Sequence, residues 1–353
     1  MASIIASPLR WGICAGGEIS NDFVSSLQGH SDSHLVVGIA TRSLERSQKF
    51  ATKFKIPSAY ASYEELAQDP NVDVVYIGAI NTAHHDLCML FLNHKKHVLC
   101  EKPLALTLRE TQDILKTAKK NDVFFMEAMW TRFFPVSAKI RELVSSGQLG
   151  DVKSVLINFG IYTPDRERTI KRDYGGGALY DMGVYMVYMT TMIFNGVAPI
   201  SSITSGVLND DGVDEMYTTV MRFRNNTMAT LSCTITADYP NEVFISGTKG
   251  HLKIPGHFWA PTELIWSKTT GELIETFQYP TPESTVEYSY GPLWSGMLYE
   301  ADAVKQAIDE GKTEHALMPW KETELVASLL EKARLDLGIV WVHQGQSPIV
   351  VLA

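Results

Sequence analysis

The chain has 353 residues, of which 45% are hydrophobic and 20% are charged, a composition that excludes disordered and fibrous proteins. Its 31 Lys and Arg residues against 40 Asp and Glu residues give a net charge of −9, and no dense basic run suits a nucleic-acid backbone. The four cysteines form no CxxC pair, so we expect a reduced, cytoplasmic protein.

The first third of the chain predicts a parallel sheet. Its opening segment, MASIIASPLRW, does not resemble a secretory signal, because no continuous apolar stretch follows a basic region. Short apolar runs then alternate with amphipathic stretches, the pattern of βαβ units. Five strands are predicted, at 9–14, 35–40, 72–79, 97–100 and 123–128. Helices are predicted after the turn AGGEIS, after the N-cap Ser43, and at 63–68, 83–93 and 108–119.

After about residue 130 the pattern changes. Apolar and polar residues alternate without intervening helices in four runs, which predicts a mostly antiparallel sheet with strands at 152–162, 202–208, 217–223 and 227–236. Asn225 and Asn226 separate the last two runs and predict a tight hairpin, because Asn tolerates positive φ.

Two helices are predicted in this second part. Residues 178–198 are apolar enough to mimic a membrane span, but Asp181 and Asn195 lie inside the segment, so we predict a buried helix and no membrane contact. Residues 319–337 form an amphipathic pattern with Pro near its start and Gly338 after its end.

The fold class that follows is α/β, in two domains. A typical domain has about 100 to 200 residues, so this length suits two units with a ligand cleft between them. We expect a dinucleotide-binding domain over 1–129, and a substrate-binding and dimerisation domain over 130–353 that is built on an open, mostly antiparallel sheet.

The turn after the first predicted strand carries part of a dinucleotide-binding fingerprint. Ala15, Gly17 and Ser20 occupy the glycine positions of GxGxxG, so only the middle glycine is present. A side chain at Gly17 would keep the backbone away from a pyrophosphate at the helix N-terminus. A plain βα turn is the alternative, but the flanking strand and helix favour nucleotide binding.

The end of the second predicted strand indicates which nucleotide binds. Arg42 and Ser43 stand where NAD sites usually have an acidic residue. A guanidinium and a hydroxyl suit a 2′-phosphate, whereas a carboxylate would repel it. NADP is therefore favoured over NAD, with a solvated arginine at a helix start as the alternative.

Polar residues also follow the third and fourth predicted strands. Asn81 and His84 come after the third, and Glu101 and Lys102 come after the fourth. Open α/β sheets bind ligands at this carboxyl edge. Singly, a capping histidine and a solvated lysine would be the plainer interpretations, but their placement beside the fingerprint favours a site. The histidines show no ligand spacing, so we predict no metal.

Several motifs then occur together and in order along nearly the whole chain: AGGEIS, the Asn81–His84 element, EKP, MEAMWTRFFP, GGGALYDMGVY and ISGTKGHLKI. In this combination the sequence resembles the Gfo/Idh/MocA oxidoreductase family. The resemblance implies an N-terminal Rossmann domain, a nicotinamide nucleotide and a C-terminal sheet that often mediates dimerisation, so we expect a homodimer. It also implies hydride transfer at a hydroxyl-bearing carbon of a sugar, polyol or trans-dihydrodiol.

The resemblance further implies catalytic roles. Lys102 is expected near the nicotinamide, and Tyr185, where many relatives have His, is the expected acid/base. Asp181 lies one turn before Tyr185 on the same predicted helix face and is assigned a supporting role. We expect Lys102 to lower the pKa of Tyr185, because a tyrosine with its ordinary pKa of about 10 is a poor base at neutral pH. Without the resemblance, Tyr185 would be taken for a buried core aromatic.

The complete expected site has two parts. The cofactor residues are Ala15, Gly16, Gly17, Glu18, Ile19, Arg42, Ser43, Asn81, His84, Glu101, Lys102, Trp130 and Arg132. Arg172 and Trp259 are candidates for the substrate pocket, where packing or solvation explains them equally well.

Two other functions are open at this point. One is a noncatalytic NADP-sensing regulator, against which the joint presence of Lys102, Asp181 and Tyr185 argues. The other is a reductase of a C=C or C=N bond, such as a biliverdin reductase.

Overall fold

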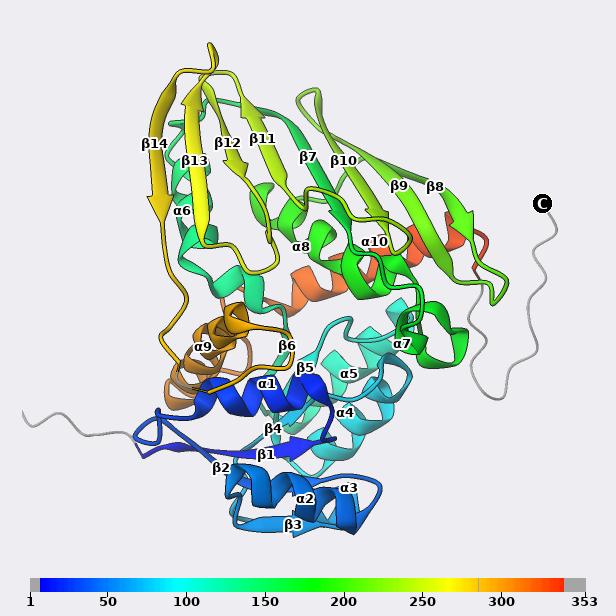
Figure 1. Ribbon diagram of the computed structural model, residues 1–353, viewed down its shortest axis with the longest axis vertical. Helices are drawn as coiled ribbons and strands as arrows, with labels where there is room; N and C mark the ends of the chain where they lie inside the picture. Colours follow the sequence, from blue (N-terminus) through cyan, green and yellow to red (C-terminus); the bar gives the residue numbers. More distant parts are fainter. Residues whose placement is uncertain (1–6, 285, 340–353) are drawn as a thin grey trace, which may run out of the picture.

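The first half of the chain forms a six-stranded parallel sheet in the order β3-β2-β1-β4-β5-β6 (Figure 1). We describe it from a computed structural model, which covers residues 7–284 and 286–339. The expectation for the N-terminal segment and the outer limits of both expected domains therefore fall partly outside the described residues. The strands are β1 (Leu9–Cys14), β2 (His34–Ala40), β3 (Ser58–Tyr60), β4 (Val74–Ile77), β5 (His97–Glu101) and β6 (Phe125–Ala128).

Helices connect these strands, because neighbouring parallel strands need crossover connections. They are α1 (Glu18–Leu27), α2 (Leu44–Phe54), α3 (Tyr63–Gln68), α4 (His84–Asn93) and α5 (Leu108–Asn121), with the 3₁₀ turn η1 (Asn81–Ala83) before α4. The sequence pattern correctly places all of these helices. Ser43 caps α2 as predicted, because its hydroxyl accepts a hydrogen bond from the Arg46 amide.

The second half contains an eight-stranded sheet in the order β14-β13-β12-β11-β7-β10-β9-β8. Within the described part of this sheet, only β7 and β10 pair in parallel, so the expectation of a mostly antiparallel sheet is confirmed. The strands are β7 (Val152–Gly160), β8 (Ser201–Leu208), β9 (Asp214–Phe223), β10 (Thr227–Thr234), β11 (Val243–Gly247), β12 (Gly250–Ile254), β13 (Glu263–Lys268) and β14 (Leu273–Gln278).

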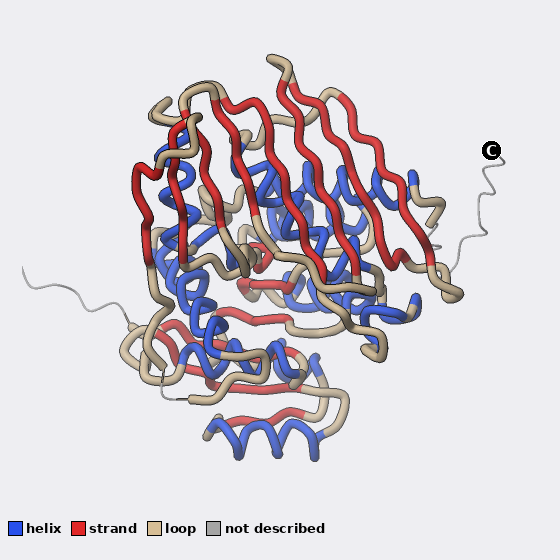
Figure 2. The backbone as a smooth tube through the Cα atoms, turned by 45° about the horizontal axis from the view of Figure 1, so that its top comes forward, coloured by secondary structure: helices blue, strands red, loops and turns tan. Residues whose placement is uncertain are grey.

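Helices cover one face of this second sheet and leave the other face without a layer (Figure 2). The helical elements are η2 (Trp130–Phe133), α6 (Pro135–Ser145), α7 (Glu167–Ile170), η3 (Arg172–Tyr174), the π-helical turn η4 (Leu179–Gly183), α8 (Val184–Ile193), η5 (Pro292–Gly296), α9 (Met297–Asp309) and α10 (Trp320–Asp336). Every residue of α8 is buried, as predicted for this apolar segment. In the described part of the chain, no helix combines the length and apolarity needed to cross a membrane.

The last two helices return to the first half of the chain. Helix α9 packs on α1, and α10 packs on both α5 and α8. The C-terminal helices therefore pack against both halves of the chain (Figure 1).

Candidate active site

The turn between β1 and α1 has the backbone of a phosphate-binding loop. Ala15 has a φ of 73°, the left-handed conformation that glycine adopts most easily, so the backbone keeps the fingerprint geometry at this substituted position. A Cβ on Gly16 would come within 3.1 Å of Phe50, which explains that glycine by packing. A Cβ on Gly17 would meet only a carbonyl oxygen at 3.9 Å. Protein packing thus gives no reason for glycine at position 17, whereas close approach of a ligand does.

The other residues of this turn are consistent with an anion site. Glu18 is exposed as the first residue of α1, and Ile19 is half-buried. The Ser20 side chain is fully buried, and its hydroxyl has no hydrogen-bond partner. Backbone N–H groups of the first helical turn and an unpartnered hydroxyl are the donors that a dinucleotide pyrophosphate uses, so the residues present fit a nicotinamide dinucleotide.

Arginines gather beside the carboxyl end of β2. Arg42 is exposed, and Ser43 lies at the N-cap of α2. Arg46, one helical turn later, is also exposed, and the charges of both guanidinium groups reach the Tyr63 hydroxyl. The sequence reasoning did not select Arg46, although its spacing of four residues from Arg42 is the signal that could have found it.

Three side chains meet where the two halves of the chain face each other. The Lys102 Nζ, just after β5, donates a hydrogen bond of 2.7 Å to the backbone oxygen of Asp181 in η4 and lies 3.6 Å from its Oδ1. The same ammonium lies 4.8 Å from the centroid of the Tyr185 ring at the start of α8. Lys102 lies about eighty positions before Asp181 and Tyr185 in the sequence, and the fold brings both residues close to its ammonium group.

The charges of this trio follow from burial and from a second cation. Burial lowers the pKa of Lys102. Burial also disfavours the Asp181 carboxylate, but Arg168 and Lys102 outweigh it and hold the pKa of Asp181 well below its ordinary value. The Arg168 Nη1 lies 2.5 Å from the Asp181 Oδ1. Sequence reasoning missed Arg168, because nothing in its local sequence shows that the fold pairs it with Asp181.

The expectation that Lys102 leaves Tyr185 with a lowered pKa is wrong. Burial, with the negative charge of Glu101 adding to it, raises the pKa of Tyr185 well above its ordinary value. The ammonium lies over the ring face rather than at the hydroxyl. Tyr185 is therefore a protonated phenol at neutral pH.

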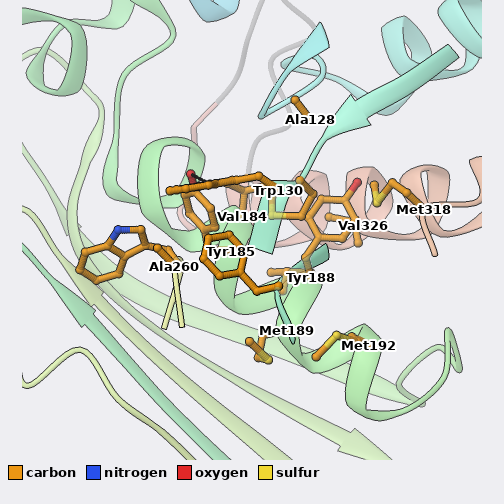
Figure 3. Packing of buried hydrophobic residues seen from close by; sticks show 14 of the residues in the cluster. Ala128, Trp130, Val184, Tyr185, Tyr188, Met189, Met192, Ala260, Met318 and Val326 are labelled. Carbon is orange, nitrogen blue, oxygen red and sulfur yellow. Dashed lines mark hydrogen bonds between the residues drawn. The ribbon is translucent and has the colours of Figure 1, made fainter. Parts of the chain in front are cut away.

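The Tyr185 hydroxyl is oriented by Trp130 (Figure 3). The indole Nε1 of Trp130 donates to the Tyr185 oxygen at 3.1 Å, and both residues are buried. Because the oxygen accepts this hydrogen bond, its own proton remains available for another acceptor. Trp130 therefore fixes the position of the Tyr185 hydroxyl.

Aromatic rings continue from Tyr185 toward the second sheet. Phe159 of β7 lies edge-on to the Tyr185 ring at 6.1 Å and stacks on Trp259 at 4.6 Å. Trp259, a candidate substrate residue, is thus one ring away from Tyr185. Phe159 was not selected from the sequence, because a phenylalanine in an alternating strand is normally core.

Other expected site residues hold the loops around the trio. The Glu101 carboxylate accepts hydrogen bonds from the Tyr76 hydroxyl at 2.7 Å and from the Lys102 amide at 3.2 Å. Burial raises the pKa of Glu101. The Asn81 amide donates to the backbone oxygen of Gly175 at 2.9 Å, a link between the two halves of the chain.

The structure places His84 between the loops that follow β4 and β5. This ring is fully buried, with Nδ1 2.8 Å from the Pro103 carbonyl and Nε2 3.1 Å from the Ala79 carbonyl. Burial lowers the pKa of His84, so the neutral ring donates to one of these two carbonyls. The carbonyls belong to the loops that follow β4 and β5, and His84 therefore positions these loops.

The structure pairs Arg132 with an acidic residue of the C-terminal part. Its guanidinium is buried in a two-pronged ion pair with Glu322 of α10, in which Nη2 lies 3.0 Å from Oε2. This ion pair ties η2 to α10. Arg172 lies in η3, where its amide donates to Asp211 at 2.6 Å. Among the described residues, no cluster of three His, Cys, Asp or Glu side chains could hold a metal ion.

Comparisons with known proteins match both halves of the chain. Residues 9–129 match the family described as an oxidoreductase family with an NAD-binding Rossmann fold. Residues 137–253 match the GFO/IDH/MocA C-terminal domain.

Full-length relatives share much of the sequence. The chain is 42% identical over 339 residues to a trans-1,2-dihydrobenzene-1,2-diol dehydrogenase of Danio rerio, covering 96% of this chain and 99% of the relative. It is 38% identical over 334 residues to the Homo sapiens protein of the same name, covering 94% and 98%. A levoglucosan dehydrogenase in complex with NADH and levoglucosan has the same fold, with a TM-score of 0.81, 18% identity and coverage of 94% and 98%.

Proposed function

The chain belongs to the Gfo/Idh/MocA oxidoreductase family, and from this membership we propose that it is an NADP-dependent dehydrogenase. It moves a hydride between the nicotinamide and a hydroxyl-bearing carbon of a sugar, polyol or trans-dihydrodiol. The type is that of a D-xylose 1-dehydrogenase or a trans-1,2-dihydrobenzene-1,2-diol dehydrogenase. The observation that carries the proposal is the meeting of Lys102, Asp181 and Tyr185 at the carboxyl edge of the parallel sheet.

The protein residues bind, orient and exchange a proton. When bound, the nicotinamide supplies the hydride acceptor or donor. The Tyr185 hydroxyl, held by Trp130, gives its proton to the oxygen of a carbonyl substrate during reduction and takes it back during oxidation. The Lys102 ammonium stabilises negative charge on that oxygen, and Asp181 fixes the ammonium. Arg168 keeps Asp181 ionised, so the carboxylate supports Lys102 and does not act as the base.

The aromatic rings favour a cyclic substrate. Phe159 and Trp259 stack beside Tyr185 and present flat, apolar surface next to the reacting group. Such surface suits the face of a pyranose or of a dihydrodiol ring.

The two alternatives lack a favouring observation. A noncatalytic sensor has no need for a desolvated lysine, an ionised aspartate and a proton-donating tyrosine at one point. A reductase of a C=C or C=N bond would need the same proton donor but an extended pocket for a tetrapyrrole. A steady-state assay with D-xylose, trans-dihydrodiols, polyols and biliverdin separates these functions. Turnover of the hydroxylated substrates supports the proposal, and turnover of biliverdin alone refutes it.

The cofactor preference rests on Arg42, Ser43 and Arg46. These residues place two cations and a hydroxyl at the end of β2, with α2 beginning behind them. A 2′-phosphate meets complementary charge there, whereas the hydroxyl of NAD finds no carboxylate to accept its hydrogen bond.

Arg42→Ala should weaken NADP binding roughly tenfold or more and leave NAD binding nearly unchanged. The expected loss is that of a charge-assisted hydrogen bond to phosphate, ~1.5 to 3 kcal/mol. Fluorescence titration with NADPH and NADH measures both affinities. An equal weakening of the two cofactors would refute the assignment of Arg42 to the 2′-phosphate.

The proposed assembly is a homodimer through the uncovered face of the second sheet. Ile203, Val220, Thr230, Leu156 and Phe244 are register partners that form one row across five strands. Ile203 is 69% exposed and Leu156 is 49% exposed. Three exposed apolar residues in this row, Ile203, Val220 and Leu156, on a sheet that helices cover on one side only, fit a second copy of the same face.

Leu156→Asp should convert the dimer into a monomer, because it places two charges in the middle of the paired faces. Light scattering at micromolar protein measures the mass. Leu335→Asp changes an equally exposed leucine on α10 and should leave the dimer intact. A monomeric unmodified protein, or a dimeric Leu156→Asp variant, would contradict the proposed interface.

The cysteines are consistent with the proposed cytoplasmic location. All four are free and buried. Reduced, buried thiols are typical of proteins in a reducing compartment.

A further inference from the structure

A short segment of the C-terminal part crosses the start of α1. Within this segment, which we call the strap and define as residues 288–291, the amides of Ser289 and Tyr290 donate to the Asp22 carboxylate at 2.6 and 3.0 Å. Asp22 lies on α1 and is fully buried. Two hydrogen bonds to a buried carboxylate fix the strap backbone beside the first turn of this helix.

The strap places the Tyr290 side chain at the phosphate-binding end of α1. Its hydroxyl donates to the Glu18 Oε2 at 2.8 Å, and Glu18 is the first residue after Gly17. Burial raises the pKa of Tyr290 to about 12, so the hydroxyl remains a donor at neutral pH. The ring also packs on Trp294 at 5.4 Å, and Trp294 packs on Trp130 at 5.4 Å. Tyr290 is therefore held from two sides.

A cation from the second half of the chain lies on this tyrosine. The Arg166 guanidinium is 5.8 Å from the centroid of the Tyr290 ring. Arg166 is exposed and, among the residues that the structure describes, forms no ion pair. Its neighbour Arg168 is different, because it is paired with Asp181. The Arg166 charge also helps to lower the pKa of Asp181, but without an ion-pair partner among the described residues it remains available for an anion at the end of α1.

We infer that Arg166, supported by Tyr290, binds the pyrophosphate of the dinucleotide from the side opposite to the glycine turn. The inference rests on the proposed function, since it concerns the cofactor of that same site. The glycine turn supplies backbone donors, an open approach at Gly17 and the unpartnered hydroxyl of Ser20. A diphosphate carries two negative charges, and the turn offers no side-chain cation to balance them. Arg166 supplies that charge from a loop that follows β7.

This site is distinct from the one proposed for the 2′-phosphate. Arg42 follows β2, where the adenosine end of a dinucleotide binds. Arg166 instead lies over the Tyr290 ring, and the Tyr290 hydroxyl is hydrogen-bonded to Glu18 at the start of α1. The two arginines should therefore respond differently to cofactors that differ in one phosphate.

Arg166→Ala should weaken binding of both NADPH and NADH by about tenfold, because both carry the pyrophosphate. Its affinity for adenosine 2′-monophosphate, which lacks the pyrophosphate, should not change. Arg42→Ala should give the complementary pattern, with weaker binding of NADPH and adenosine 2′-monophosphate and unchanged binding of NADH. Fluorescence titration for the reduced cofactors and calorimetry for the mononucleotide measure these affinities without turnover.

Two further variants complete the experiment. Arg224→Ala removes an exposed arginine from the β9–β10 turn and should leave every affinity unchanged. Tyr290→Phe removes the hydrogen bond to Glu18 but keeps the ring and should weaken NADPH and NADH in the same direction as Arg166→Ala. Dissociation constants of Arg166→Ala within about twofold of the unmodified protein for both reduced cofactors would overturn the inference. An unmodified protein that binds neither cofactor would overturn the proposed function as well, so the two failures are distinguishable.

Discussion

Tyr185→Phe should lower kcat by ~10²- to 10⁴-fold, the range of general acid/base contributions, and leave cofactor affinity nearly unchanged. The substitution removes only the hydroxyl that accepts the Trp130 hydrogen bond. The ring keeps its edge-on contact with Phe159, so the substrate pocket retains its shape. Steady-state kinetics and fluorescence titration of NADPH measure the two quantities.

A neighbouring tyrosine provides the control. Tyr180 lies in the π-helical turn η4, directly before α8, and its hydroxyl donates to the Leu106 carbonyl at 2.7 Å. Tyr180→Phe also removes a buried hydroxyl, but one that donates to a backbone carbonyl, so it should affect stability and leave kcat nearly intact. If Tyr185→Phe kept more than about a tenth of the unmodified kcat, Lys102 would have to be the proton-transferring group.

The raised pKa of Tyr185 fixes the sign of the pH dependence. Burial favours the neutral phenol, so the protonated form predominates at neutral pH. Reduction of a carbonyl needs this form, and its kcat/KM should therefore fall only when pH rises above the raised pKa. Oxidation needs the deprotonated form, and its kcat/KM should increase continuously toward alkaline pH. A profile for oxidation that levels off near neutrality would contradict Tyr185 as the base.

Lys102→Met should lower kcat by roughly 10²- to 10³-fold, because the charge that develops on the substrate oxygen loses its cationic partner. The variant should also shift the alkaline rise in kcat/KM for oxidation to higher pH. The ammonium lies 4.8 Å from the Tyr185 ring, and removing a cation makes the phenolate less favourable. The pH dependence of kcat/KM measures this shift. If kcat/KM for oxidation rose at the same pH as in the unmodified protein and kcat were nearly unchanged, Lys102 would have no role in the mechanism.

Much of the fold was predictable, because it depends on local patterns. The βαβ alternation predicts five of the six strands of the parallel sheet, and the Asn225–Asn226 pair predicts the β9–β10 turn, where both residues have positive φ. The exception is β3, whose three residues are half-buried and give no apolar run. The strands β11 to β14 were also missed, and the segment that forms β11 and β12 was recognised only as a family motif.

The candidate site was less predictable, because tertiary partners decide what each side chain does. Arg132 has the sequence context of a pocket residue, but its partner Glu322 lies 190 positions away. Arg168 has the context of a solvated arginine, but the fold pairs it with Asp181. The pKa of Tyr185 depends on burial and on Glu101, which no spacing along the chain shows.

The central claim is that hydride moves from a hydroxyl-bearing carbon of the substrate to the cofactor. Incubation of the protein with NADP⁺ and D-xylose deuterated at the anomeric carbon, or a trans-dihydrodiol deuterated at its carbinol carbons, followed by mass spectrometry of the reduced cofactor, tests this transfer directly. The account predicts one deuterium in each molecule of NADPH that forms. Reduced cofactor without deuterium, or no reduced cofactor with any sugar, polyol or diol, would contradict it.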